Sequence, residues 1–266
     1  MPPNSTKIMQ DWGLLDLVQS KAAMPEFMRF LSYRDGEVLH ELQLWPDMEM
    51  KFGTPHLLIH RREILNILLD EARKLKVTLR VNSQVTRIDL SVPSITTAAG
   101  DVLTAQIIIG ADGERSFCRS TILGRPHTLC ATGKLVYRFT LDLDFVRGNS
   151  ELGHLVNPPA VSCWIGPRSH IVAYELPSDG IFNVSLTCPD PVEGRVQLGP
   201  READLDELRR CFAQWDPTFV KLLEFAAHTR FWTLVQLPEE NRVWIDDEAQ
   251  RTILIGDAAH AMQPYL

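Results

Sequence analysis

A run of apolar residues that ends at a glycine occurs twice in this chain. Ile107–Ile109 is a run of three β-branched residues, the pattern of a strand buried on both faces, and Gly110 follows it. The second run, Thr252–Ile255, is followed by Gly256. Ligands in an open α/β sheet bind just beyond the carboxyl ends of the strands. The pattern therefore predicts two buried strands, each ending at a candidate ligand site.

The rest of the pattern predicts helices and strands in alternation. Apolar residues at helical spacing predict a helix over Arg61–Lys76, and a second helix that is capped by Asn4 or Ser5 and reaches Val18. A loop-rich stretch is expected from Val18 to about His56. Further strands are expected at Val77–Val81, Gln84–Leu90, Ser94–Ala98, Lys134–Leu141, Val161–Ile165, His170–Leu176, Ile181–Thr187, Phe231–Leu237 and Arg242–Ile245, and helices at Glu202–Trp215 and Pro217–His228.

These elements predict an α/β chain that is α+β overall. Helix followed by strand indicates an α/β layer, whereas short strands about ten residues apart after Gly133 indicate an antiparallel sheet. We expect a partial Rossmann-like domain over residues 1–124 and 239–266, with an inserted, mostly antiparallel substrate domain over residues 125–238. Pro189–Pro200 is interpreted as a linker.

Composition excludes several classes of function. A net charge of −7 and a pI near 5.6 argue against a nucleic-acid partner, which would favour a basic excess. The five cysteines form no CxxC pair or Cys/His cluster, so neither a disulfide framework nor a metal site is indicated, and a reducing, cytoplasmic location is expected. No apolar run approaches the roughly 18–20 residues of a membrane span, and no signal peptide is visible.

Each of the two strand ends carries an aspartate beside a glycine. Asp112 precedes Gly113, and Asp257 follows Gly256. A carboxylate there accepts hydrogen bonds from ribose or ribityl hydroxyls, and glycine lets the backbone approach a ligand or adopt a positive φ. If Asp257 caps a helix that starts at Ala258, the small alanines leave room for a flat ring. The alternative is that both aspartates are turn or cap residues without a ligand.

Three motifs together resemble a known family. GADGERSFCR at 110–119 is similar to the DG motif, and GDAAHAMQP at 256–264 to the GD motif, of the FAD-dependent aromatic hydroxylases. These are single-component flavoprotein monooxygenases typified by salicylate and p-hydroxybenzoate hydroxylases. His60–Leu65 resembles the family's HRxxL helix start, whose arginine contacts the flavin. The resemblance covers about residues 4–266 in the family's order and spacing.

The resemblance implies a cofactor, a reaction and site residues. FAD would be bound by Arg61, Asp112, Gly113, Gly256 and Asp257, with NAD(P)H as co-substrate and O₂ as oxidant. A small, aromatic or secondary-metabolite substrate would be hydroxylated or otherwise oxygenated. Arg61 as a surface residue at a helix start is the alternative for that position.

Further residues are assigned by the same resemblance. Arg138 and Tyr174 match the arginine and tyrosine of salicylate-hydroxylase-like members, where the arginine holds a carboxylate or phenolate and the tyrosine donates to the transferred oxygen. The alternative makes both of them strand residues with solvent-exposed tips. His60 and His260 are interpreted as packing residues rather than acid–base groups. Arg119 pairs with Asp112 or Glu114, or else contacts the cofactor.

One element of a dinucleotide site is missing from the sequence. None of the 15 glycines forms even a G-x-G, whereas G-x-G-x-x-G normally lies over the pyrophosphate. The chain resembles the middle of a monooxygenase, truncated at both ends, and we expect it to bind FAD poorly alone. A non-catalytic family remnant is therefore the alternative function. A flavin-dependent halogenase or dehydrogenase is a third reading, without a lysine-centred motif to support halogenation.

Overall fold

The chain folds into two compact units. The computed structural model describes residues 1–192 and 199–263. Unit 1 consists of Met1–Val77, Leu135–Pro189 and Gly199–Trp232, and the described residues of unit 2 are 78–134, 190–192 and 233–263. Unit 1 thus contains the first 77 residues together with the large sheet, whereas the sequence analysis assigned residues 1–124 to the Rossmann-like domain. Part of the expected linker, residues 193–198, lies outside the described residues.

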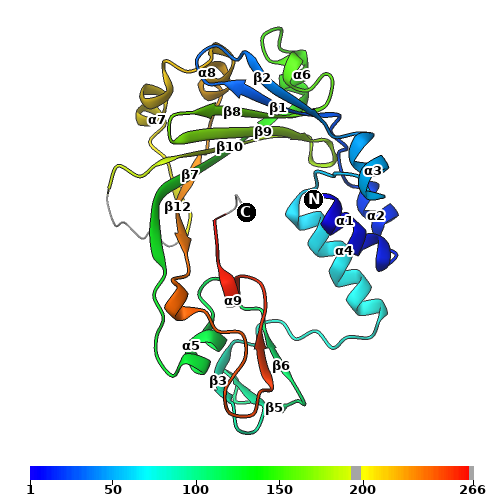
Figure 1. Cartoon of the computed structure of the whole chain (residues 1–266), viewed down its shortest axis with the longest axis vertical. Coiled ribbons are helices and arrows are strands. Elements are labelled where there is room, and N and C mark those ends of the chain that lie inside the picture. The colour runs from blue at the N-terminus through cyan, green and yellow to red at the C-terminus, as the bar shows by residue number, and fades with distance from the viewer. Residues whose placement is uncertain (193–198, 264–266) are drawn as a thin grey trace. The chain divides into compact units, whose positions relative to one another are not determined.

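An eight-stranded sheet organises unit 1, with its strands in the order β11-β12-β7-β10-β9-β8-β1-β2 (Figure 1). The sheet is mostly antiparallel as expected, but β1 runs parallel to β8. The strands are β1 (Phe27–Ser32), β2 (Val38–Gln43), β7 (Cys130–Asp142), β8 (Ala160–Gly166), β9 (Ser169–Leu176), β10 (Ile181–Pro189), β11 (Arg201–Glu202) and β12 (Arg230–Gln236).

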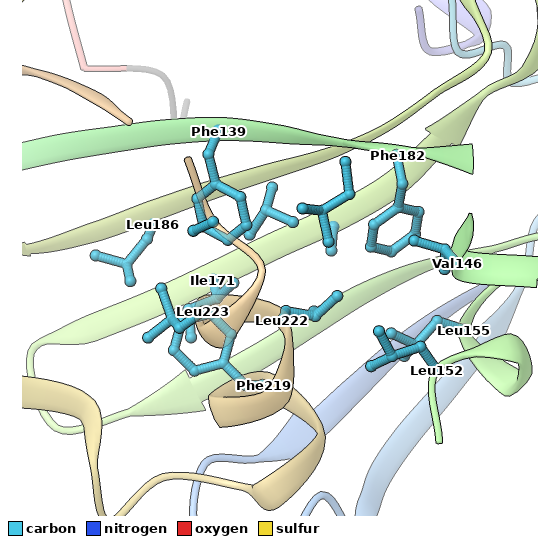
Figure 2. Close-up of a cluster of buried hydrophobic side chains, with 14 of the residues drawn as sticks. Phe139, Val146, Leu152, Leu155, Ile171, Phe182, Leu186, Phe219, Leu222 and Leu223 are labelled. Atoms are coloured by element: carbon cyan, nitrogen blue, oxygen red, sulfur yellow. The ribbon is translucent and has the colours of Figure 1, made fainter. Parts of the chain in front are cut away.

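One face of this sheet carries the main hydrophobic core. Three helices lie against it: α6 (Leu143–Gly148), α7 (Leu205–Phe212) and α8 (Pro217–Glu224). Figure 2 shows Phe139 of β7 and Phe182 of β10 on the same side of the sheet as Phe219 of α8. Because side chains alternate along a strand, Phe182, Val184 and Leu186 all point into this core. The opposite face of β10 is therefore free to present polar residues.

The opposite face is partly covered by the first third of the chain. Its helices are α1 (Pro3–Asp11), α2 (Leu15–Gln19), α3 (Asp47–Phe52) and α4 (Arg61–Lys74). Leu44, Val161 and Cys163 form a small buried cluster, against which Val172 and Tyr174 of β9 pack. Tyr174 thus lies on the face of the sheet opposite the main core.

Two predictions for this region are wrong. The single helix to Val18 is two helices, because Gly13 adopts a left-handed φ of +71° between them, and α1 begins after Pro2 rather than at Asn4 or Ser5. The stretch expected to be loops contains β1, β2 and α3. Every residue of β2 is exposed, so this strand lacks the apolar alternation from which a strand is predicted.

Among its described residues, unit 2 contains two small sheets, two short α-helices and the 3₁₀ helix Glu239–Asn241. β13 (Thr252–Leu254) pairs in parallel with β6 (Ile108–Gly110), and β3 (Val85–Asp89), β4 (Ser94–Thr97) and β5 (Val102–Thr104) form an antiparallel sheet. The α-helices are α5 (Phe117–Leu123) and α9 (Asp257–His260). Strands expected at Val77–Val81 and Arg242–Ile245 are not formed, although Ile245 makes a single bridge to Ile253.

The prediction that both glycine-terminated strands are buried is wrong for β6 and confirmed for most of β13. Ile107 is 54% exposed and Ile109 61%, whereas Thr252 and Leu254 of β13 are buried and Ile255, beyond the end of β13, is 49% exposed. In the described parts of the chain, β6 pairs with β13 alone, so its other edge is unpaired and Ile109 remains in solvent. The other edge of β13 is partly covered, because Ile245 bridges to Ile253 and the Leu254 N–H donates to the Trp244 carbonyl. Gln84, Ile88, Ile109 and Phe117 also border an open pocket of about 550 Å³.

A fully buried aspartate stabilises the turn before β13. Asp246 accepts backbone N–H bonds from Ala249, Gln250, Arg251 and Thr252 at 2.6–3.0 Å. Burial alone would raise the pKa of Asp246, but these donors outweigh burial and lower it. The carboxylate therefore stays charged and fixes the loop.

No helix in the described residues is long and apolar enough to cross a membrane.

Candidate functional site

The turn after β6 is held by its own aspartate. Asp112 accepts a hydrogen bond from the Ser116 hydroxyl at 2.5 Å and another from the Cys118 backbone N–H at 3.0 Å. Gly113 adopts a φ of +80°, a conformation that other residues rarely tolerate. Burial by itself would raise the pKa of Asp112, but the hydrogen bonds prevail and lower it. This carboxylate is thus a charged turn residue, with each oxygen already accepting one bond.

Cys118 in the same turn is not a reactive thiol. Burial, and next the charge of Asp112, raise the pKa of the Cys118 thiol to about 12. A thiol with such a pKa stays protonated at neutral pH, and only the thiolate is a nucleophile. The chemistry of this turn therefore lies in its shape and in the Asp112 charge.

Arg119 connects the two glycine–aspartate turns. Its guanidinium is fully buried, and Nη1 donates to the main-chain oxygens of Asp257 at 3.1 Å and Ala258 at 2.5 Å. Nη2 donates to the main-chain oxygen of Glu114. The sequence suggested carboxylate partners for Arg119, but its hydrogen bonds go to main-chain carbonyls. Arg119 therefore positions the turn after β13 against the turn after β6.

His127 completes this buried polar group, and no sequence signal pointed to it. Its Nε2 lies 2.6 Å from Arg119 Nη2, and its Nδ1 lies 2.7 Å from the Ser120 hydroxyl. Since arginine only donates, Nε2 must accept, which assigns the proton to Nδ1. Burial first, and then the Arg119 charge, lower the pKa of His127. The imidazole therefore acts as a neutral acceptor for Arg119.

The turn after β13 leaves its aspartate free. Gly256 has a φ of +58° and occupies the cap position, so α9 starts at Asp257 itself. The expectation that Asp257 caps a helix starting at Ala258 is therefore wrong, and the alanines expected to make room for a ring are fully buried. Asp257 is exposed, and its carboxylate has no hydrogen bond or ion pair within residues 1–192 and 199–263. It remains available to hydroxyl donors of a ligand.

Two histidines next to these motifs have structural roles. His60 caps α4, because its Nδ1 accepts the Arg62 backbone N–H at 3.1 Å. The His260 ring packs on Trp244 with centroids 5.2 Å apart.

The first residue of α4, Arg61, is exposed and has no hydrogen bond or ion pair among the described residues, whereas Arg62 pairs with Asp179. Arg61 therefore offers a free guanidinium in unit 1.

Arg138 and Tyr174 lie on the same face of the large sheet. Arg138 alternates along β7 with Tyr137 and Phe139, which contact the main core, so Arg138 points away from it. Its guanidinium lies over the Trp232 ring, 5.9 Å from the centroid. Strand β10 lies between β7 and β9 in the sheet, so Arg138 and Tyr174 share a face with one strand between them.

Comparison with known proteins identifies the family. Residues 2–266 match the FAD binding domain family. The chain belongs to the FAD-dependent aromatic hydroxylases. This hydroxylase-family chain is 31% identical over 270 residues to the FAD-dependent monooxygenase OpS4 of Beauveria bassiana, covering 100% of this chain and 62% of that relative. It is 26% identical to 3-hydroxybenzoate 6-hydroxylase of Klebsiella oxytoca, covering 99% of this chain and 64% of the relative.

Solved structures share the fold of this family member. A salicylate hydroxylase substrate complex superposes with a TM-score of 0.78 at 21% identity, covering 99% of this chain and 66% of the other. An HpxO complex with FAD and uric acid, from Klebsiella pneumoniae, gives 0.76 at 22% identity, covering 99% and 64%. The chain thus spans less than two thirds of the length of each of these proteins.

The residues present fit part of an FAD molecule. The free Asp257 carboxylate suits ribityl or ribose hydroxyls, and Gly256 in its left-handed conformation adds no side chain beside it. Nothing in the sequence supplies the glycine-rich turn that would hold the pyrophosphate. The fit is therefore good for the hydroxyl-bearing part of FAD and incomplete for its phosphates.

Proposed function

We propose that this chain serves in an FAD-dependent monooxygenase that uses NAD(P)H and O₂ to oxygenate a small aromatic or secondary-metabolite substrate. The observation that carries the proposal is the free Asp257 carboxylate, positioned by Arg119 in a chain of this family. FAD supplies the redox chemistry when bound, and the protein binds and orients the reactants. The relatives are named as monooxygenases and hydroxylases, so a non-catalytic remnant is not favoured.

The proposed cofactor residues have separate tasks. Asp257 accepts hydroxyl hydrogen bonds from FAD, and Gly256 keeps the approach open. Asp112 and Gly113 shape the neighbouring turn and add negative charge rather than offering a wholly free carboxylate. Arg61 contacts the flavin through its unpaired guanidinium.

The proposed substrate residues are Arg138 and Tyr174. Arg138 holds a carboxylate or phenolate by a charge-assisted hydrogen bond, and the Tyr174 hydroxyl donates a hydrogen bond to the oxygen that is transferred. Two relatives are named for the aromatic acids 3-hydroxybenzoate and 6-hydroxynicotinate, which carry the carboxylate that such an arginine would bind. An aromatic acid is therefore the substrate class that we propose.

The location belongs to the same proposal. All five cysteines have free thiols, and three of them lie at buried or half-buried positions. Free thiols persist in a reducing compartment. We therefore propose a cytoplasmic location, which fractionation of cells that express the tagged protein would test.

A flavin titration tests the proposed function. The purified chain is titrated with FAD while flavin fluorescence is followed, and absorbance is then scanned at about 370 and 450 nm after desalting, where bound flavin absorbs. We expect saturable but weak binding that desalting largely removes, because phosphate contacts worth roughly 1.5–3 kcal/mol each are not supplied. The absence of a saturable change at any FAD concentration would contradict the proposal. Stimulation of NAD(P)H oxidation by 3-hydroxybenzoate is the next assay for an FAD-loaded sample.

A further inference from the structure

Asn183 on β10 carries a buried polar group that the proposed function does not use. The residue is 5% exposed, and its side-chain Nδ2 is buried without a hydrogen-bond partner in the described residues. A buried amide donor without an acceptor is destabilising, and native structures retain few such groups. An apolar side chain of similar size would avoid this loss. The unpartnered amide therefore calls for a functional explanation.

The position of Asn183 gives that explanation. Its neighbours along β10, Phe182 and Val184, point into the main core, so Asn183 points to the other face of the sheet. The Cα partner of Asn183 across the β9–β10 pairing is Tyr174. Residues directly opposite each other in an antiparallel pair have Cβ atoms about 4.5–5.5 Å apart and share a face. The unsatisfied donor thus lies beside the proposed substrate residue Tyr174.

Three neighbouring strands therefore present three different polar groups on one face. β7 carries the cation Arg138, β10 carries the neutral donor Asn183, and β9 carries the phenol Tyr174. An arginine recognises a carboxylate, whereas a neutral amide N–H recognises an uncharged or phenolate oxygen. A benzoic acid with a hydroxyl group on its ring carries both acceptors, a carboxylate and a hydroxyl oxygen, in one rigid molecule. Benzoate itself carries the first acceptor and lacks the second.

We propose that Asn183 is a substrate-binding residue that selects hydroxylated aromatic acids. Its Nδ2 donates a hydrogen bond to the oxygen of the hydroxyl group on the aromatic ring. This inference rests on the proposed function, since it uses the same substrate face. The donor is desolvated before the substrate arrives, so a ligand without a matching acceptor leaves it unsatisfied. Asn183 therefore discriminates between ligands more than it adds to their common affinity.

The test compares two ligands and two variants of the whole chain. The probes are 3-hydroxybenzoate and benzoate, titrated calorimetrically in the absence of FAD. Asn183→Leu removes the amide at similar volume. Thr229→Val is the matched control. Thr229 is also in unit 1, is 1% exposed, and its hydroxyl has no hydrogen-bond partner among the residues that the structure describes, but it precedes β12 rather than lying on β9 or β10.

The two readouts give opposite signatures for a binding role and a structural role. We expect the wild-type chain to prefer 3-hydroxybenzoate over benzoate, and Asn183→Leu to reduce that preference by roughly three- to tenfold, the value of one hydrogen bond. The melting temperature of Asn183→Leu should equal or exceed that of the wild type. Thr229→Val should also melt at or above the wild-type temperature, and it should keep the wild-type preference for 3-hydroxybenzoate over benzoate.

Other results would overturn the inference. The inference fails if the wild-type chain shows no preference for 3-hydroxybenzoate over benzoate, or if Asn183→Leu keeps the wild-type preference. Either result would exclude recognition of the hydroxyl oxygen on the ring by this amide. A marked fall in the melting temperature of Asn183→Leu would show that the amide is structurally satisfied. Failure of the FAD titration with the ligand preference intact would instead reject the proposed function and leave the role of Asn183 standing.

Discussion

The two units of the chain are stabilised in different ways. Unit 1 has an extensive hydrophobic core in which Trp164, Phe182 and Phe219 are fully buried. Unit 2 leaves Ile107, Ile109 and Ile255 in solvent and relies on buried charged groups. Apolar packing therefore stabilises the sheet that carries the proposed substrate residues, whereas a few hydrogen-bonded charges stabilise the proposed cofactor turns.

Removing a core aromatic should have the largest effect. Phe219→Ala in unit 1 is expected to lower the free energy of unfolding by about 3–5 kcal/mol, because it deletes a fully buried ring from the cluster around α8. Urea unfolding followed by tryptophan fluorescence measures the change. Phe145→Ala is the control, since Phe145 is 41% exposed and should cost much less. Equal losses in both variants would mean that this core does not dominate the stability of unit 1.

A buried carboxylate should be the next most sensitive position. Asp246→Asn is expected to cost about 2–3 kcal/mol, because the amide offers one acceptor oxygen where two carboxylate oxygens receive four backbone donors. Asp247→Asn, at the exposed neighbouring residue, controls for the change in net charge. If the two substitutions cost the same in urea unfolding, unit 2 would not depend on this charge.

Protonation of His127 should have a smaller, pH-dependent effect. The unfolded residue has its ordinary pKa near 6.5, and the folded residue has a lower one because of burial and Arg119. Between these two pKa values the unfolded chain binds the proton and the folded chain does not, so stability is lost as pH falls below about 6.5. One proton contributes at most about 1.4 kcal/mol per pH unit.

His127→Gln keeps an acceptor for Arg119 and cannot titrate. Its unfolding free energy should therefore depend less on pH below 6.5 than that of the wild type. Some dependence will remain, because burial, followed by the charge of the N-terminus, lowers the pKa of His56 to about 4. His154→Gln, at an exposed histidine of unit 1, is the control. If the unfolding free energy of His127→Gln depends on pH as strongly as that of the wild type, protonation of His127 does not contribute to the loss of stability.

The sequence predicted unit 1 better than unit 2. Short alternating strands and amphipathic helices predicted β8–β10 and α4 to within two residues of their observed bounds, because their apolar residues face a core. In contrast, β7 begins four residues earlier and α8 ends four residues earlier than predicted. The same logic failed at Ile107–Ile109, where a buried-strand pattern lies at a sheet edge in the described chain. Periodicity reports which face is apolar, and it carries no information on whether a neighbouring strand covers that face.

The sequence motifs predicted which residues belong to the candidate site, but not which hydrogen bonds those residues make. Family resemblance picked out Asp112 and Asp257 alike, yet one of them is bonded within its own turn and the other is free. The Arg119 hydrogen bonds to main-chain carbonyls and its contact with His127 had no sequence signal, because carbonyl acceptors are the same at every residue. The amide of Asn183 became visible only through its burial and its pairing with Tyr174.

The central claim is that the two aspartates have different tasks, and one paired measurement tests it. FAD titration and urea unfolding are carried out on Asp257→Ala and Asp112→Ala. We predict that Asp257→Ala weakens FAD binding by roughly 10- to 100-fold, the value of a charge-assisted hydrogen bond, without lowering stability. Asp112→Ala should lower the stability of unit 2, because the Ser116 hydroxyl and the Cys118 N–H lose their acceptor. Unchanged FAD binding together with lost stability in Asp257→Ala would contradict the account.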